Sequence, residues 1–526
     1  LMKITGKWLD RLDVEDESIW LVLLVALSCL YVALVFCAAW LSDDAYITFR
    51  TIDNFINGFG LRWNVDERVQ SYTHPLWFLV LSALYSLTGE IYFTSLVVSM
   101  LLSFAAVGLA LRLAVSRQMA VLGLLILLSS RAFIDYTTSG LETPLSYFLA
   151  ATFFSVYFGR IGGTNRLFWL SLIASLAALN RLDTSLIYAP AVLVVTVSAW
   201  RSGMKPLELI YKLAAGASPL IVWFLFSYIY YGFPFPNTYY AKLWTGIAPL
   251  DLFVQGLRYV WDSLTEDTLT LAFVTAMLAS LFIRSDVKSR AAGVGVLLYL
   301  LYTLKIGGDF MSGRFFALPL LIAVMVVGLQ KMRPSTVALV AALSLIIGLL
   351  VPRPSLLYFF QTPEAFKQQG LADERGFYYA YSGLMRREEG RPRMFVDEFV
   401  DSALADRAMA LEKNGNETFV VNKWNIGYYG YFAGANVHVI DELGLADPLL
   451  ARLPIIYPDF WTAGHYPRAI PDGYEESIRT GENLISDTEI AILYDDIKLI
   501  TRGPLFSRER FGAILRQNLG QRFVQD

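Results

Sequence analysis

Charged residues are scarce in this chain of 526 residues. They make up 17% of it, whereas hydrophobic residues make up 56% and aromatic residues 14%. About a quarter of the residues are charged in a typical soluble domain. The low charge and the repeated long apolar runs exclude a wholly soluble protein and predict a polytopic α-helical membrane protein. The formal net charge of −3 offers no basic surface for nucleic acid, so we expect no nucleic-acid partner.

Cysteine and histidine are nearly absent, with two and three residues respectively. Cys29 and Cys37 lie in the first apolar run, about 12 Å apart along a helix that rises 1.5 Å per residue, so they cannot pair. His74, His438 and His465 are isolated in the sequence and lack the spacing of a zinc site. The chain also lacks a glycine-rich phosphate loop and a Gly-x-Ser-x-Gly elbow, so a nucleotide-sugar donor has no visible binding motif.

The composition changes near residue 351. Apolar runs fill residues 1–351, and we predict a transmembrane domain there; charged residues, glycine and proline return in 352–526, which we predict to be a soluble α/β domain. In that domain we expect strands at 393–400, 417–421 and 435–440, and helices at 401–413 and 508–517.

The clusters of Lys and Arg between apolar runs predict the topology, because short cytoplasmic loops retain positive charge. They predict about eleven spans, with the N-terminus cytoplasmic and the soluble domain extracytoplasmic. The expected spans are 19–41, 91–111, 118–134, 144–158, 167–180, 185–200, 209–231, 267–283, 291–305, 315–330 and 335–351. Residues 75–87 are too few to cross comfortably, and we expect a juxtamembrane or re-entrant helix there.

With this topology the unusual polar motifs all fall on the extracytoplasmic side. Asp43 and Asp44 directly follow the first span, and Glu142 precedes a later one. The polar loops predict that the functional site is an extracytoplasmic cavity. A transporter would place polar groups near the midplane of its helices. Simpler interpretations remain open: the two aspartates end a helix in solvent, and Glu142 is a helix N-terminal charge favoured by the dipole.

Four stretches carry a resemblance to a known family. They are Asp43-Asp-Ala-Tyr-Ile-Thr-Phe-Arg50, the run from Asn64 to Trp77, Ser139-Gly-Leu-Glu-Thr143 and Phe235-Pro-Asn-Thr-Tyr-Tyr-Ala-Lys242. They resemble the GT-C membrane glycosyltransferases that use polyprenyl-phosphate sugars, and most of all the mycobacterial terminal arabinofuranosyltransferase family, arabinofuranosyltransferase B. The likeness continues into 425–432 and 440–448.

The resemblance implies a pentosyltransferase in the bacterial inner membrane with an outward-facing, periplasmic site. The implied donor is arabinofuranose on a decaprenyl or similar polyprenyl monophosphate, and the implied acceptor is a cell-envelope glycan, glycolipid or glycoprotein. Such a transfer needs a carboxylate to take the acceptor proton, for which Asp43 or Asp44 is the first candidate and Glu142 the second. The adjacent carboxylates are also able to hold a divalent cation, and the sequence leaves metal use open.

Further candidates lie in the same loops. Arg and Lys suit a phosphate, and Tyr and His suit a sugar or phosphate. The candidates for the donor phosphate or sugar are Tyr46, Arg68, Tyr72, His74, Arg181, Tyr239, Lys242, Lys305, Asp309 and Arg314. Those for the acceptor are Tyr428, Tyr429 and His465. Snorkelling cations, interfacial aromatic belts and packing at turns are the structural alternatives.

Two other functions stay open at the level of the sequence. One is a GT-C transferase that moves a different polyprenyl-phosphate sugar to a protein or to lipid A. The other is a transporter of lipid-linked sugars that makes no glycosidic bond.

Overall fold

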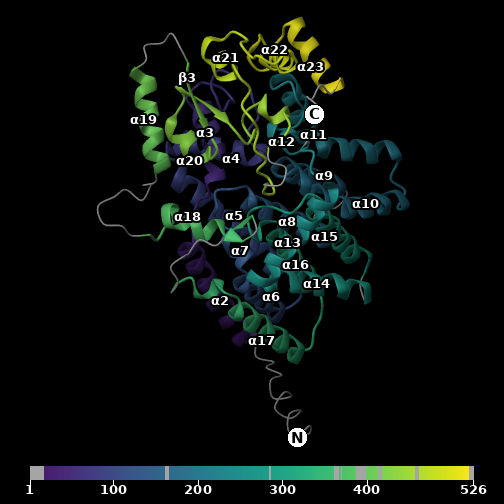
Figure 1. Ribbon diagram of the computed structural model, residues 1–526. Coiled ribbons are helices and arrows are strands. Elements are labelled where there is room, and N and C mark those ends of the chain that lie inside the picture. The colour runs from purple at the N-terminus through teal and green to yellow at the C-terminus, as the bar shows by residue number, and fades with distance from the viewer. Residues whose placement is uncertain are drawn as a thin grey trace. The chain divides into compact units, whose positions relative to one another are not determined.

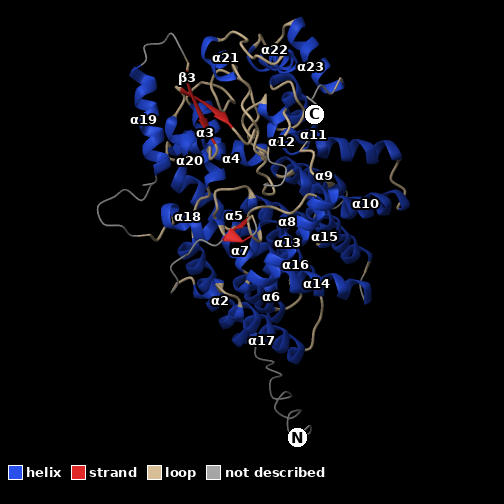
Figure 2. Ribbon diagram, viewed as in Figure 1, coloured by secondary structure: helices blue, strands red, loops and turns tan. Residues whose placement is uncertain are grey.

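The computed structural model describes residues 17–159, 165–243, 245–283, 286–359, 367–368, 370–386, 398–412, 418–456 and 461–520. Helices dominate these residues, and strands are few and short (Figure 2). The chain forms two compact units, each assembled from three separate stretches. The first unit contains Leu1–Trp40, Ser95–Pro219 and Leu250–Arg387; the second contains Leu41–Thr94, Leu220–Pro249 and Glu388–Asp526. The predicted domain boundary at 351 remains a prediction.

The first unit is a bundle of apolar helices. Its helices are α2 (Glu17–Ala38), α5 (Ile91–Leu113), α6 (Arg117–Ser129), α7 (Arg131–Asp135), α8 (Thr143–Phe158), α9 (Arg166–Asn180), α10 (Ser185–Arg201), α11 (Pro206–Tyr230), α13 (Pro249–Glu266), α14 (Thr268–Ile283), α15 (Val287–Lys305), α16 (Arg314–Gly328), α17 (Pro334–Leu350) and α18 (Glu374–Ser382). Helices α5 and α11, and the first residue of α13, contribute to the second unit as well. Two short antiparallel strands, β1 (Lys367–Gln368) and β2 (Leu371–Ala372), precede α18.

Small residues allow close packing within this bundle, as is typical of membrane helices. Helices α10 and α15 lie along each other (Figure 1). A Cβ atom on Gly295 of α15 would lie 2.1 Å from the carbonyl oxygen of Ile187 in α10, so a side chain there would separate the two helices.

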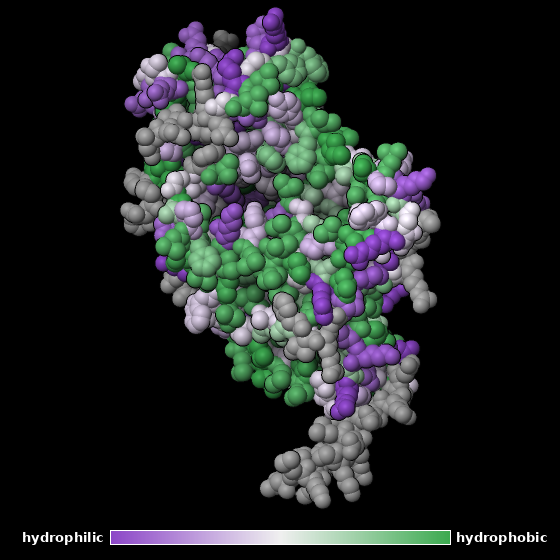
Figure 3. All heavy atoms as spheres, turned by 90° about the vertical axis from the view of Figure 1, so that its right-hand side faces the viewer, coloured by the Kyte–Doolittle hydropathy of each residue, from purple (hydrophilic) through white to green (hydrophobic). Residues whose placement is uncertain are grey.

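The apolar helices confirm a helical membrane protein. Each of the eleven predicted spans is occupied by a helix in the described residues. Five helical segments are long and apolar enough to cross a membrane: Ser18–Ala38, Ile91–Leu113, Leu182–Arg201, Pro206–Tyr230 and Val287–Lys305, and a sixth is obtained if the bent pair α13 and α14 counts as one span. The other predicted spans correspond to shorter apolar helices, so the number eleven and the topology stay predictions. The face drawn in Figure 3 carries broad areas of apolar side chains.

The second unit combines the first loop with the C-terminal part of the chain. It contains α3 (Asp43–Ile56), α4 (Pro75–Thr88), α12 (Asn237–Leu243), α19 (Glu398–Glu412), α20 (Gly427–Ala433), α21 (Tyr474–Thr480), α22 (Thr488–Arg502) and α23 (Arg508–Leu519). Strand β3 (Phe419–Lys423) pairs in parallel with β4 (Val437–Asp441), and α20 forms the connection between them. Helix α4 is the short helix expected at 75–87, and it ends at Gly89 with a φ of 65°.

Most of the secondary structure predicted for the C-terminal part is found. Strands β3 and β4 and helices α19 and α23 coincide with predicted elements. The strand predicted at 393–400 is wrong at its end, because 398–400 already belong to α19; residues 393–397 lie outside the described residues.

Arg50 explains why distant stretches fold together in the second unit. Its buried guanidinium donates to the carbonyl oxygens of Trp63 at 2.8 Å, Gly430 at 2.8 Å and Val437 at 2.7 Å, and lies 4.2 Å from the centre of the Trp63 ring. Asn64 pairs with β4 as a neighbouring strand would, because its side-chain amide both donates to and accepts from the backbone of Val439 at 3.1 Å.

Candidate functional site

Asp43 is built into the junction of two helices of the second unit. Ser42 caps α3 by accepting a hydrogen bond from the Ala45 amide at 3.3 Å, and Asp43 is the first residue of that helix. The Asp43 carboxylate accepts from the first two amides of α20, Gly427 at 3.1 Å and Tyr428 at 2.7 Å. An anion is favoured at a helix N-terminus, so Asp43 joins α20 to α3.

The close approach of α20 requires glycine. A Cβ atom on Gly427 would lie 2.0 Å from the backbone oxygen of Asp43 and 2.4 Å from its carboxylate. Tyr428 is buried, and its hydroxyl donates to the Leu41 carbonyl oxygen at 3.0 Å. The predicted acceptor residue Tyr428 therefore belongs to the support of the acid pair.

Asp44 differs from its neighbour in exposure. It is partly exposed, whereas Asp43 is only 4% exposed. Tyr46 is fully buried among aromatic rings, with the Tyr428 ring centred 4.5 Å away, and this burial raises the pKa of its phenol above the ordinary value. His74 lies before α4 with Nε2 2.8 Å from the Thr48 hydroxyl of α3.

Two predicted donor residues of the second unit are committed to the fold. The buried Arg68 guanidinium donates to the carbonyl oxygens of Gly503 and Ile500 at the end of α22. Tyr72 is buried, stacks on Phe78 with ring centres 4.4 Å apart, and has its hydroxyl 2.9 Å from that of Tyr231. Arginine at a helix C-terminus satisfies orphan carbonyl groups, which explains Arg68 without a ligand.

The remaining predicted residues of this unit vary in exposure. Tyr239 is 41% exposed on α12, and Lys242 is exposed on the same helix. Tyr429 is buried, with its hydroxyl donating to Asp406. His465 is partly exposed in a turn, where its amide donates to the Thr462 carbonyl oxygen at 2.8 Å.

In the first unit, Glu142 stands at the centre of a charge cluster. Nη2 of Arg314 donates to the two oxygens of its buried carboxylate at 3.0 and 3.1 Å, and Nη1 of Arg181 donates to one of them at 3.2 Å. Arg181 also binds Asp183 at 2.9 Å, and Arg314 approaches Asp309 at 3.4 Å. Glu142 precedes α8 but makes no side-chain capping hydrogen bond, so its arginine contacts account for its position better than the helix dipole does.

Four of the predicted residues thus lie together: Glu142, Arg181, Asp309 and Arg314. Asp183 completes the cluster. Lys305, by contrast, is an exposed residue at the end of α15.

His438, which is isolated in the sequence, has an acidic partner in the fold. Its Nδ1 lies 2.9 Å from Asp66, which also binds Arg502 at 3.0 Å. Burial alone would raise the pKa of Asp66, but the charges of His438 and Arg502 hold it below its usual range. Burial would lower the pKa of His438, but Asp66 raises it above 6.5. No local sequence signal links Asp66 to His438.

A second ion network in the first unit also escaped the sequence analysis. Arg131 in α7 binds Asp373 at 2.6 Å, Glu266 at 2.9 Å and Asp135 at 3.3 Å. Arg353 binds Glu266 at 3.3 Å and also Asp373. The three acids and the two arginines join α7, the end of α13 and the segment before α18, which is a structural role.

The residues at the acid pair do not fit a cation site formed by two carboxylates. Both Asp43 oxygens face backbone N–H groups, which are donors and repel a cation. Among the described residues no group of three or more His, Cys, Asp or Glu side chains is arranged to hold a metal ion.

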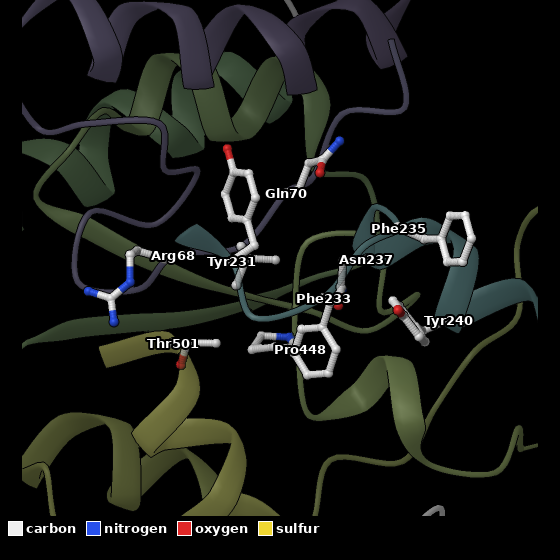
Figure 4. Close-up of a pocket in the computed structure, with 10 residues that line it drawn as sticks. Arg68, Gln70, Tyr231, Phe233, Phe235, Asn237, Tyr240, Pro448 and Thr501 are labelled. Carbon is white, nitrogen blue, oxygen red and sulfur yellow. The ribbon is translucent and has the colours of Figure 1, made fainter. Parts of the chain in front are cut away.

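A pocket with about 10 Å³ of internal space in the second unit is lined by Arg68, Thr501 and aromatic rings of the 231–240 segment (Figure 4). Its polar residues Gln70 and Asn237 already bind within the fold: Gln70 accepts from Ser227 at 2.9 Å, and Asn237 donates to Gly444 at 2.9 Å. A water molecule needs roughly 10–15 Å³ of such space, so the pocket has room for about one water and we interpret it as a feature of packing.

Comparison with known proteins supplies the functional context. No protein-family model matches the chain. It is 26% identical over 531 residues to the terminal β-(1→2)-arabinofuranosyltransferase of Corynebacterium glutamicum, covering 79% of this chain and 71% of that protein. It is also 26% identical over 512 residues to the protein of the same name from Mycobacterium tuberculosis, covering 78% of each.

These two likenesses extend through most of the chain and agree with the resemblance seen in its motifs. They confirm the predicted relationship and the predicted enzyme class. The chain is related to the terminal arabinofuranosyltransferases and is a glycosyltransferase.

Proposed function

We propose that this chain transfers arabinofuranose from a polyprenyl-phosphate donor, of the decaprenyl-phosphoryl-arabinofuranose type, to a cell-envelope glycan or glycoconjugate. The proposed location is the outer face of the bacterial cytoplasmic membrane. The observation that carries the proposal is the similarity, over 78–79% of the chain, to two proteins named terminal β-(1→2)-arabinofuranosyltransferase. The apolar helices support a donor that stays in the bilayer through its polyprenyl chain.

The proposed reaction makes one bond and breaks one. An acceptor hydroxyl oxygen attacks the anomeric carbon of arabinofuranose, and the bond from that carbon to the phosphate oxygen breaks. Polyprenyl phosphate leaves with the electron pair, and the hydroxyl proton passes to a carboxylate. General-base help of this kind is worth roughly 10²- to 10⁴-fold in rate.

We assign the base to Asp44 and a positioning role to Asp43. The Asp43 carboxylate is buried and occupied by the Gly427 and Tyr428 amides, which supports a role in holding α3 against α20. Asp44 is partly exposed one residue further along the same first turn. From the sequence alone, Asp43 and Asp44 are equal candidates for the base.

For the phosphate we propose Arg314 and Arg181. Fixed cations stabilise the charge that develops on a leaving phosphate, and an arginine fork binds two oxygens at once. Glu142 contacts both guanidinium groups and is proposed to hold their orientation rather than to move the proton. The exposed Tyr239, Lys242 and Lys305 stay predicted donor contacts, and His465 stays a predicted acceptor contact.

The donor is tested with the purified full-length chain in lipid nanodiscs. Radiolabelled polyprenyl-phosphate arabinofuranose and polyprenyl-phosphate mannose are offered in parallel, with a synthetic arabinan oligosaccharide as acceptor. We expect label in the oligosaccharide from the arabinofuranose donor alone. Transfer of mannose at an equal rate, or of mannose only, would assign the chain to another polyprenyl-phosphate sugar.

A further inference from the structure

Helix α13 has an arrangement opposite to that of a helix on a soluble protein. Six large apolar side chains recur at helical spacing along one face, and all are exposed; among them Leu250 is 70%, Leu257 47% and Trp261 67% exposed. The six are Leu250, Phe253, Val254, Leu257, Trp261 and Leu264. A soluble helix would turn such a stripe toward the core.

The opposite face of α13 is polar and buried. The Tyr259 hydroxyl donates to the Met311 carbonyl oxygen at 3.1 Å and accepts from the Phe315 amide at 3.0 Å. Asp262 accepts from the Ser312 hydroxyl at 2.6 Å. The polar face therefore packs against the loop before α16. This loop contains Asp309 and leads into Arg314.

A fixed bend joins α13 to α14. The two helices meet at 110°, with the buried Asp267 between them. Asp267 accepts from the Ala132 amide at 2.8 Å and from the Thr270 hydroxyl at 2.6 Å, and Glu266 binds Arg131 at 2.9 Å. These contacts hold the corner, so the bend is part of the fold.

We propose that α13 lies along the membrane interface, with its apolar face in the acyl region of bilayer lipid and its polar face on the loop that carries Asp309. The α14 segment was predicted as a span, and a helix bent by 110° from a span lies close to the membrane plane. The apolar stripe carries a tryptophan and is flanked by the exposed Asp251 and Arg258. This is the pattern of an interfacial helix.

The inference does not depend on which sugar the chain transfers. An interfacial α13 gives a physical reason for the position of the charge cluster at Glu142. The loop that leads to Arg314 packs on this helix, which lies at the bilayer surface. An interfacial α13 therefore fixes this loop, and with it the partner of Glu142, at the depth of the lipid headgroups.

Spin labels measure the environment of α13 directly. In full-length protein with Cys29→Ser and Cys37→Ser, one cysteine is introduced at Leu257 or at Trp261 and labelled with a nitroxide. The matched control is Ile492 of α22, which is also an exposed apolar residue, 50% exposed, in an α-helix. The protein is placed in nanodiscs of phosphatidylcholine and phosphatidylglycerol, and collision with oxygen is compared with collision with a water-soluble nickel chelate.

We expect the ratio of oxygen to nickel accessibility to be several-fold higher at Leu257 and Trp261 than at Ile492. A ratio equal to that at Ile492 would overturn the proposal, as would dipolar broadening that places a second copy of the chain on the stripe. In a protein with native cysteines, lipids brominated in their acyl chains should quench less fluorescence after Trp261→Phe; unchanged quenching would contradict the lipid contact.

Discussion

Asp43 and Asp44 are neighbours in the chain, but their surroundings differ and so should the effects of replacing them. We expect Asp44→Asn to lower the transfer rate by roughly 10²- to 10⁴-fold, because the proposed base is lost. Asp43→Asn turns one acceptor oxygen into an N–H donor that faces a backbone N–H. The unsatisfied donors should cost about 1–3 kcal/mol and lower the Tm.

Steady-state transfer rates and thermal unfolding of the two purified variants check this contrast. Full activity in Asp44→Asn would remove the assignment of the base. A Tm for Asp43→Asn equal to that of the unaltered protein would show that the junction does not need the carboxylate.

Nη2 of Arg314 donates to both carboxylate oxygens of the buried Glu142, which also binds Arg181. We expect Arg314→Met to destabilise the protein by about 3–5 kcal/mol, the usual cost of breaking a buried ion pair. Arg201→Met, at the exposed end of α10, is the matched control and should change stability by less than about 0.5 kcal/mol. Equal thermal stability of the two variants would contradict a structural cluster at Glu142.

The His438–Asp66 pair makes stability depend on pH with opposite signs. The pKa of His438 is raised above 6.5, so its contribution is complete below 6.5 and is lost as pH rises through the folded-state pKa. The pKa of Asp66 is lowered below 3.8, so its contribution is complete above 3.8 and is lost as pH falls through the folded-state pKa. Both contributions are complete only between these limits.

Thermal unfolding at a series of pH values, for the unaltered protein and for His438→Gln, measures this effect. The difference in Tm between the two proteins should be largest near pH 5 and should shrink at alkaline pH. A difference that stays constant from pH 5 to pH 9 would show that the histidine is uncharged in the fold.

Helix α20 packs closely against α3. We expect Gly427→Ala to destabilise the protein by about 1–3 kcal/mol, because its Cβ would lie 2.0 Å from the Asp43 backbone oxygen and force α20 away from α3. Gly512→Ala in α23 is the control: its Cβ would meet only an arginine side-chain end at 3.4 Å, and the change should be neutral or stabilising. Thermal unfolding measures the Tm of both variants. A Gly427→Ala protein with the Tm of the unaltered protein would contradict close packing of α20 on α3.

The sequence predicts elements well where one local pattern suffices. Long apolar runs predict helices, because a run of apolar side chains is stable in a bilayer as a helix. A helix is found at each of the eleven expected spans. Helix α13 was missed because its apolar residues form a stripe interrupted by Asp251, Arg258 and Asp262 instead of a run. A helical period over 249–266 is the signal that would have found it.

The candidate site is predictable only in part, for a physical reason. The types and loop positions of Glu142, Arg181, Asp309 and Arg314 suggested function one by one, and the fold brings the four together. The roles of Arg68 and Asn64 depend on backbone groups several hundred residues away, such as the Ile500 and Val439 carbonyl oxygens. Pattern and propensity carry no information about contacts at that separation.

The whole molecule is a helical membrane protein and a glycosyltransferase related to the terminal arabinofuranosyltransferases. The acid pair on α3 belongs to the second unit, and the Glu142 cluster belongs to the first. What distinguishes a transferase from a carrier of lipid-linked sugar is the breaking of the bond between sugar and phosphate.

The most direct test follows both products of that bond. The purified chain in nanodiscs is given polyprenyl-phosphate arabinofuranose and an arabinan acceptor, and mass spectrometry quantifies the extended glycan and the free polyprenyl phosphate. We expect one arabinofuranosyl residue to be added for each polyprenyl phosphate released. Intact donor after prolonged incubation, or release of polyprenyl phosphate without extension of the glycan, would contradict it.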